Sequence, residues 1–185
     1  MIYKKHIGIE IPGLQIDGKD APYPVLNERA IRATAGIMMM FALLTVFYTI
    51  FAKEYILIRI LIIVFFTDFF IKVMWGPKYS LISKMGAWIV RKQKPEYVWA
   101  VQKRFAWSLG LFMSTCMVFI SVIFGITGII PLSFCSTCIV LMWLETSFGI
   151  CVWCKIYYFL IHKGVIREPV HRPACPGGTC SIGRK

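Results

Sequence analysis

The chain has 185 residues, of which 58% are hydrophobic and 16% are charged, and its formal net charge is +12. Soluble domains carry about a quarter charged residues, so this composition argues against an ordinary soluble domain and indicates that lipid is the solvent. The positive charge does not indicate a nucleic-acid-binding domain, because Lys and Arg cluster beside long apolar runs, as they do in membrane proteins. We therefore predict an integral membrane protein that contacts the lipid bilayer and not nucleic acid.

The first 29 residues form a polar N-terminal segment, predicted to be cytoplasmic. Residues 1–29 are interrupted by prolines and contain no short apolar stretch with a cleavage site, so no cleavable signal peptide is expected. The Asp17-Gly18 turn signal favours a small hairpin. Asn27 is a suitable N-cap for the first helix.

Two apolar segments follow, each long enough for one crossing. Residues 33–52 carry no charge over twenty positions, about the length that a helix needs to span a bilayer. Residues 55–75 are also apolar but contain Arg59 and Lys72 near their ends and Asp68 inside. We predict that both segments are transmembrane helices.

The segment 76–103 joins the second and third crossings. Leu81, Met85 and Trp88 recur at helical spacing, while Lys84 lies on another face. This pattern predicts a cytoplasmic amphipathic helix that lies on the membrane surface. The alternative is a short soluble helix that caps the bundle.

The longest apolar stretch predicts the last two crossings. Residues 105–144 carry no charge, and forty residues are enough to cross a bilayer twice. Gly125 and Pro131 mark the turn between the crossings. We therefore place the third helix at about 105–126 and the fourth at about 132–160. The predicted fold is all-α, with four transmembrane helices.

The basic residues predict the orientation. Lys and Arg number five in 1–32, eight in 72–104 and six in 155–185, against two, Lys53 and Arg59, that flank the first outer loop. Such a bias places both termini and the central loop in the cytoplasm. The transmembrane domain is predicted to span 30–162, and a cytoplasmic tail follows.

Four cysteines in the predicted fourth helix are the candidates for chemistry. Cys135 and Cys138 lie near its outer end, and Cys151 and Cys154 lie near its inner end. A CxxC pair on one helical face can exchange thiols and disulfides, while four thiolates could hold zinc or an iron–sulfur cluster. A shared site is disfavoured, because on a straight helix the two pairs would be about 24 Å apart and on nearly opposite faces. The alternative is that these cysteines are small packing residues.

The tail, residues 163–185, contains a third cysteine pair. The turn Pro-Gly-Gly lies between Cys175 and Cys180, and His171 is close in sequence. This arrangement suggests a mobile dithiol arm or half of a metal site. The alternative is a flexible tail with two unreactive thiols. Metal binding stays open, and no cofactor is predicted.

Two acidic residues lie inside predicted crossings, where charged groups are costly and usually functional. Asp68 is four residues before Lys72, so a local ion pair is the simplest interpretation. Glu145 has no such neighbour in its own helix and shares a face with Cys138. Both are placed near mid-depth, and a structural polar contact is favoured over proton transfer for Glu145.

Four motifs resemble a family of small bacterial membrane proteins, the domain-of-unknown-function family 4395. The resemblance covers about 24–160 and rests on Pro24-Val-Leu-Asn-Glu-Arg-Ala30, on Asp68 with Gly76-Pro-Lys-Tyr-Ser80, on Gln102-Lys-Arg-Phe-Ala106, and on Glu145 with Gly149-Ile-Cys-Val-Trp-Cys154. It implies a four-helix domain of the bacterial inner membrane with a CxxC at the inner end. It also implies an association with thioredoxin-like and sulfurtransferase proteins. Cys135 and Cys138 fall outside the pattern.

Three functional hypotheses follow. In the first, Cys151 and Cys154 exchange electrons or sulfane sulfur with a cytoplasmic thioredoxin-like or rhodanese-like partner. In the second, the chain is a small transporter of a sulfur compound, with Asp68 and Glu145 along its path. In the third, it is a non-catalytic membrane subunit or scaffold. Whether the protein is an enzyme stays open.

Overall fold

The computed structural model describes residues 8–11, 14–16, 19–20, 23–165 and 182–184. A short 3₁₀ turn precedes the third helix, and a π-helical turn, Val118–Ile123, extends the fourth. Within the described part the chain is predominantly helical, as predicted, and its α-helices are α1 (Glu28–Ala52), α2 (Ile56–Met74), α3 (Leu81–Ile89), α4 (Ala100–Met117), α5 (Ile129–Phe148) and α6 (Val152–His162).

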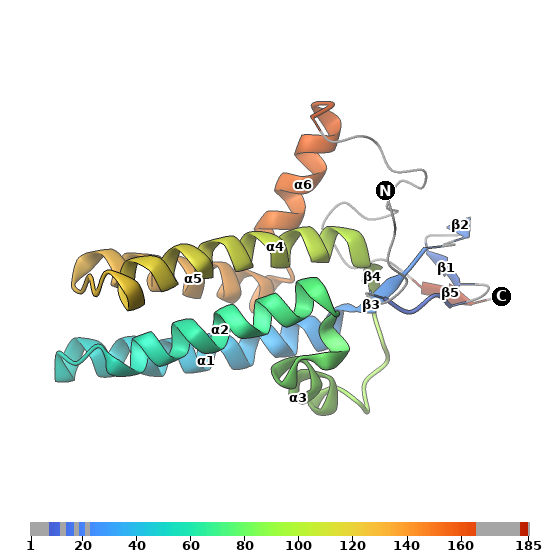
Figure 1. Ribbon diagram of the computed structural model, residues 1–185. Coiled ribbons are helices and arrows are strands. Elements are labelled where there is room, and N and C mark those ends of the chain that lie inside the picture. Colours follow the sequence, from blue (N-terminus) through green and yellow to red (C-terminus); the bar gives the residue numbers. More distant parts are fainter. Residues whose placement is uncertain (1–7, 12–13, 17–18, 21–22, 166–181, 185) are drawn as a thin grey trace.

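Four of the helices form an elongated bundle. Helices α1, α2, α4 and α5 run along its length, and α6 leaves it at a steep angle (Figure 1). Helix α1 packs on α5 and α3, and α2 packs on α4. The connections before α3 and α4 and the start of α6 therefore meet at one end of the bundle.

A two-stranded sheet closes that end, although an all-α fold was predicted. Strand β3 (Val25–Asn27) pairs antiparallel with β4 (Tyr97–Trp99). Val25 and Trp99 are buried in a cluster with Tyr23 and with Tyr157 of α6. This short pair adds to the predominantly helical fold that was predicted. It could not be predicted from the sequence, because β3 and β4 are separated by three α-helices in the chain and meet only when it is folded.

The N-terminal segment contains the predicted hairpin. Strands β1 (Leu14–Ile16) and β2 (Lys19–Asp20) pair antiparallel on either side of the Asp17-Gly18 position. Strand β5 (Ile182–Arg184) pairs antiparallel with the other edge of β1. The backbone therefore connects the C-terminal segment to the N-terminal one.

Helix α1 begins at the predicted cap. The Asn27 side chain accepts hydrogen bonds from the backbone N–H groups of Arg29, at 3.1 Å, and Glu96, at 3.3 Å. Helix α4, in contrast, begins at Ala100 and not at 105. The predicted later start was wrong because Lys103 does not end the helix as a solvent-exposed charge but is buried inside the bundle, within the first turns of α4.

The predicted fourth helix is in fact two helices. Helix α5 ends at Phe148, and α6 starts at Val152 after a break at Gly149. Gly149 has φ 67°, a left-handed conformation that commonly ends helices. The single helix 132–160 was therefore wrong, and Glu145 lies near the end of its helix and not near mid-depth.

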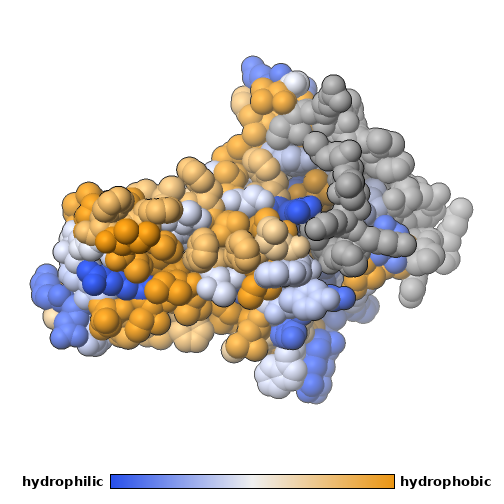
Figure 2. Space-filling view, viewed as in Figure 1, coloured by the Kyte–Doolittle hydropathy of each residue, from blue (hydrophilic) through white to orange (hydrophobic). Residues whose placement is uncertain are grey.

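The chain is a multi-pass membrane protein. Three of the described helices are long and apolar enough to cross a membrane: α1, α4 with its π-turn, and α5. Large apolar side chains on them point outward. Figure 2 shows the hydrophobic flank of the bundle, with most hydrophilic residues of this view toward its ends. An exposed apolar band of this kind suits lipid and not water.

Helix α3 presents its apolar side outward. Leu81 and Trp88 are largely exposed, with Met85 between them. The opposite side contacts α1 through Gly86, where an added Cβ would lie 2.2 Å from Thr34 Oγ1. The predicted apolar face therefore exists and does not pack on the bundle.

Candidate functional site

The CxxC of α6 lies at the start of that helix. Cys151 is the residue before the first helical turn, and Cys154 lies within that turn. Both are free thiols, 5% and 2% exposed, packed with Ala106 of α4 and Trp153. The break at Gly149 creates this helix start, so it converts two ordinary mid-helix positions into a helix N-terminus. Cysteines at such a terminus are favourably placed for thiolate formation.

The two thiols are electrostatically unequal. A side-chain hydrogen bond from Cys154 lowers the pKa of Cys151, and the positive charge of Lys103 acts in the same direction against the effect of burial. The pKa of Cys154 is raised, because this thiol donates to Cys151 and is itself buried. Its sulfur also lies 3.8 Å from the backbone oxygen of Gln102. The thiolate of Cys151 therefore forms more readily than that of Cys154.

A buried ionic cluster lies beside the CxxC. Lys103 Nζ is 3.0 Å from Glu28 Oε1 and 2.8 Å from Glu145 Oε1, and the lysine side chain is 2% exposed. Three helices, α1, α4 and α5, each supply one charge. Removing one member of such a buried group leaves an uncompensated charge, so the cluster strongly constrains how these helices meet.

Arg32 supplies the second positive charge of this region. Its Nη2 donates to the backbone oxygens of Thr146, at 2.9 Å, and Ser147, at 3.3 Å, near the end of α5. It also interacts electrostatically with Glu28. With Lys103, it formally balances the two carboxylates. A cation at a helix C-terminus is also favourable toward the helix dipole.

Asp68 belongs to a separate buried group. Its carboxylate lies 2.5 Å from Lys72 Nζ, and it accepts a hydrogen bond from Ser80 Oγ at 2.5 Å. The ion pair predicted from the four-residue spacing is confirmed. Ser80 is the N-cap of α3, so this group ties α2 to the start of α3.

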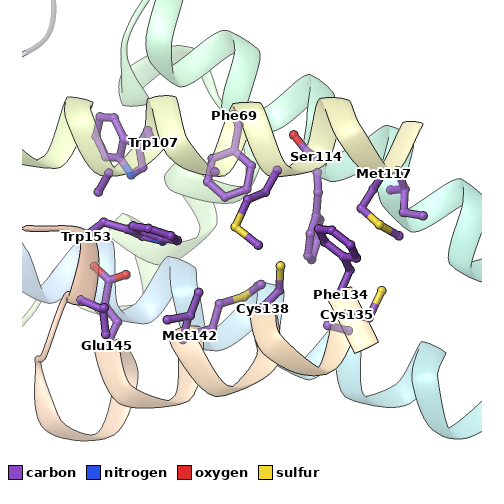
Figure 3. Close-up of a pocket in the computed structure, with 18 of the residues that line it drawn as sticks. Phe69, Trp107, Ser114, Met117, Phe134, Cys135, Cys138, Met142, Glu145 and Trp153 are labelled. Carbon is purple, nitrogen blue, oxygen red and sulfur yellow. The ribbon is translucent and has the colours of Figure 1, made fainter. Parts of the chain in front are cut away.

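A cavity of about 120 Å³ lies between α4 and α5, against α2. Figure 3 shows Cys138, Phe134 and Met142 of α5 facing Trp107 and Ser114 of α4 across it. Among its lining residues are Cys135, Cys138 and Cys151, whereas Cys116 is absent. The Cys135–Cys138 pair and Cys151 of the other CxxC, predicted to face opposite ways, thus line one cavity because the helix is broken. They remain at different depths: Cys138 is about 15 Å along α5 from its end.

A second cavity, of about 330 Å³, lies among α1, α2 and α3. Buried Lys72 lines it, as do Lys78 and Lys84 near the bundle end. The two cavities have four lining residues in common: Phe69, Trp107, Met142 and Glu145. Glu145 is thus the acidic residue at the junction, while Asp68 lines neither cavity.

The remaining predicted site residues are not brought together by the described structure. Cys175 and Cys180 lie outside the described residues. Within the described part of the chain, no group of three or more His, Cys, Asp and Glu is placed to hold a metal ion. A zinc or iron–sulfur site formed by the two helical CxxC pairs therefore has no support.

Sequence reasoning missed Lys103, the ionic partner of Glu145, and Glu28, which is paired with the same lysine. Lys103 was counted with the cytoplasmic positive charges, and Glu28 was treated as part of a polar segment. The signal was present, because each occupies one of the motifs on which the family resemblance rests. Those motifs supply Glu28, Lys103, Glu145 and the CxxC, and in the structure they meet at one end of the bundle.

Comparison with known proteins identifies one family. A family model described as a domain of unknown function, DUF4395, matches residues 26–162. No curated protein and no solved structure is significantly similar to the chain.

Proposed function

The chain belongs to the DUF4395 family, and from that premise we propose that it is a membrane thiol module that exchanges electrons or sulfane sulfur with a cytoplasmic thioredoxin-like or sulfurtransferase partner. The observation that carries this proposal is the CxxC at the start of α6, where Cys151 is the N-cap residue and is buried in one cluster with Cys154. The interaction of this pair with buried Lys103 supports it.

The chemistry follows from the unequal thiols. The Cys151 thiolate attacks one sulfur of the partner's disulfide and forms a mixed disulfide, and the other partner sulfur leaves as a thiolate. Cys154 then attacks Cys151, so that the pair loses two electrons and the partner becomes a dithiol. With a persulfide donor, Cys151 instead takes the outer sulfur and the donor leaves as a thiolate.

Four crossings orient this site toward the cytoplasm. Helix α2 is the fourth crossing in addition to the three apolar helices, because its internal Asp68 and Lys72 neutralise each other. Helix α3 lies in the interface with Leu81 and Trp88 toward lipid, which its exposed apolar side supports. The positive-inside rule then assigns the α3 and α6 end to the cytoplasmic side of a bacterial inner membrane.

Trapping of the mixed disulfide tests the proposal. The protein is reduced, placed in phosphatidylcholine nanodiscs and mixed with oxidised thioredoxin as a probe of the partner class. Cys154→Ser is expected to trap a mixed disulfide through Cys151, Cys151→Ser to trap none, and Cys116→Ser to behave as the wild type. If Cys151 and Cys154 never change redox state with thioredoxin or with a polysulfide donor, the proposal is wrong.

A transporter of a sulfur compound is the second candidate, favoured by one observation. The two cavities meet at Glu145, so together they extend from the Lys78 and Lys84 side toward Cys135. Glu145→Ala is expected to abolish uptake of a sulfur oxyanion, such as thiosulfate, into proteoliposomes.

A non-catalytic scaffold predicts instead that serine at all seven cysteine positions leaves function intact while partner binding persists.

A further inference from the structure

The cavity between α4 and α5 provides an approach to the reactive thiol. Cys151 lines this cavity, whereas Cys154 does not, and little of Cys151 is exposed elsewhere. A small molecule inside the cavity therefore meets the sulfur that attacks first. Cys151 therefore belongs both to the lining of the cavity and to the CxxC, so a molecule bound in the cavity can react with the dithiol.

The side chains that line the cavity indicate which kind of molecule it can bind. Aromatic rings from three helices contribute Phe69 of α2, Trp107 of α4 and Phe134 of α5 (Figure 3). The thioethers of Met113 and Met142 add polarisable surface. Polar groups are few, so the cavity suits an apolar planar ring. Its volume is near the roughly 150 Å³ of a protein cavity that holds benzene.

The helices around the cavity indicate the route by which such a molecule enters. Helices α4 and α5 are two of the apolar helices able to cross a membrane, and the pair makes little direct contact. The molecule that enters between them is therefore dissolved in lipid. Glu145 lies at the Cys151 end, ion-paired to Lys103, and is the one carboxylate among the residues that line this apolar cavity.

We propose that this cavity binds a membrane quinone, whose ring takes two electrons from the Cys151–Cys154 dithiol. The inference rests on the proposed thiol function and names a second oxidant for the dithiol, beside the partner's disulfide. A reduced partner, exchanging in the reverse direction, converts the Cys151–Cys154 disulfide back to the dithiol. The Cys151 thiolate adds to the quinone ring, and Cys154 then attacks Cys151, forming the S–S bond and leaving the electron pair on the ring. The two thiols release two protons and the two quinone oxygens take up two, so one dithiol and one quinone become one disulfide and one quinol.

Anaerobic quinone reduction in nanodiscs tests the inference. Reduced protein in phosphatidylcholine nanodiscs is mixed with ubiquinone-1, whose fully substituted ring resists permanent arylation by thiols. We expect one quinol per two thiols lost, with a rate that saturates in quinone. Cys154→Ser is expected to stop quinol formation, because no disulfide can close.

Cavity-filling variants distinguish quinone reduction inside the cavity from quinone reduction elsewhere on the protein. Cys138→Phe, on the lining, is expected to lower the initial quinone rate about tenfold or more, because a small change of pocket volume has effects of this size. Val140→Phe adds the same ring to the same helix at an exposed position off the lining and is expected to have no effect. Ser114→Leu fills the cavity from α4 and serves if Cys138→Phe does not fold.

The possible outcomes distinguish failure of the quinone inference from failure of the proposed thiol function. If wild-type protein exchanges with thioredoxin but does not reduce ubiquinone-1, the quinone inference is overturned and the thiol function stands. Equal quinone rates in the wild type and in folded cavity-filling variants overturn it as well, because the quinone then reacts outside the cavity. Reaction with neither oxidant overturns both.

Discussion

At the scale of single residues, the organising group is Lys103. Its ammonium bridges Glu28 and Glu145 from two other helices and interacts electrostatically with both CxxC thiols. A lone lysine in this position would be costly to bury, and the paired carboxylates offset that cost. The same residue thus stabilises the bundle end and favours the Cys151 thiolate.

Loss of Lys103 is expected to destabilise the protein strongly. Lys103→Met leaves two buried carboxylates without their partner, which costs about 3–5 kcal/mol. Unfolding in detergent measures the change, and Lys94→Met, at an exposed loop position, is the control. Adding Glu28→Gln and Glu145→Gln to Lys103→Met is expected to recover much of the loss. Independent, additive effects of the three substitutions would contradict this account.

The pH dependence of Cys151 reactivity follows from its hydrogen bond. The pKa of Cys151 is lowered chiefly by the Cys154 thiol, so its thiolate, and with it the alkylation rate, appears at lower pH than for an ordinary cysteine. Cys154→Ala removes that donor and is expected to shift the midpoint of the alkylation profile to higher pH. Mass spectrometry of the Cys151 peptide measures it, with Cys116→Ser as the control. An unchanged midpoint would show that the hydrogen bond is not the cause.

At the scale of elements, the decisive feature is the break between α5 and α6. The stretch from 129 to 162 is apolar enough to read as one helix, and hydrophobic periodicity alone cannot locate an interruption in it. The left-handed Gly149 ends α5, and Arg32 binds the carbonyls next to it. The interruption places the CxxC at a helix start and lets Cys151 and Cys138 line one cavity.

Gly149→Ala is expected to disturb the site as well as the fold. The left-handed conformation costs a residue with a Cβ about 1–2 kcal/mol. This cost favours a continuous helix over the break. Gly164→Ala is the matched control, because Gly164 has φ 73° but lies beyond α6. Both variants are expected to lose similar stability, while only Gly149→Ala slows alkylation of Cys151. Equal alkylation rates in the two variants would mean that the break does not activate the thiol.

At the scale of the whole molecule, polar groups collect at one end of an apolar bundle. The Glu28 cluster, the Asp68 group, the β3–β4 sheet, α3 and the CxxC all lie there, while the other end holds the two short turns around 53 and 125. This asymmetry is what a protein working at one face of a membrane requires. It also explains why one end carries all the motifs of the family resemblance.

Cysteine labelling tests the four-crossing orientation. In a variant whose seven cysteines are replaced by serine, Lys53→Cys is expected to react with an impermeant maleimide added to intact cells. Lys94→Cys is expected to react only after the cells are opened, because it lies in the central loop. Labelling of both from outside would remove α2 as a crossing, whereas labelling of Lys94→Cys alone from outside would reverse the orientation.

The sequence by itself determined the class of protein, most helix positions and the chemistry available. Long uncharged runs must be helical in lipid, because no other segment satisfies its backbone there, and the spacing of Asp68 and Lys72 was enough to predict their ion pair. Only the tertiary structure decided the break at Gly149, the β3–β4 pair and the meeting of Glu28, Lys103 and Glu145. These depend on contacts between residues far apart in the chain, which local periodicity does not record, and they turn the CxxC from a pair on a helix into a buried, charged site.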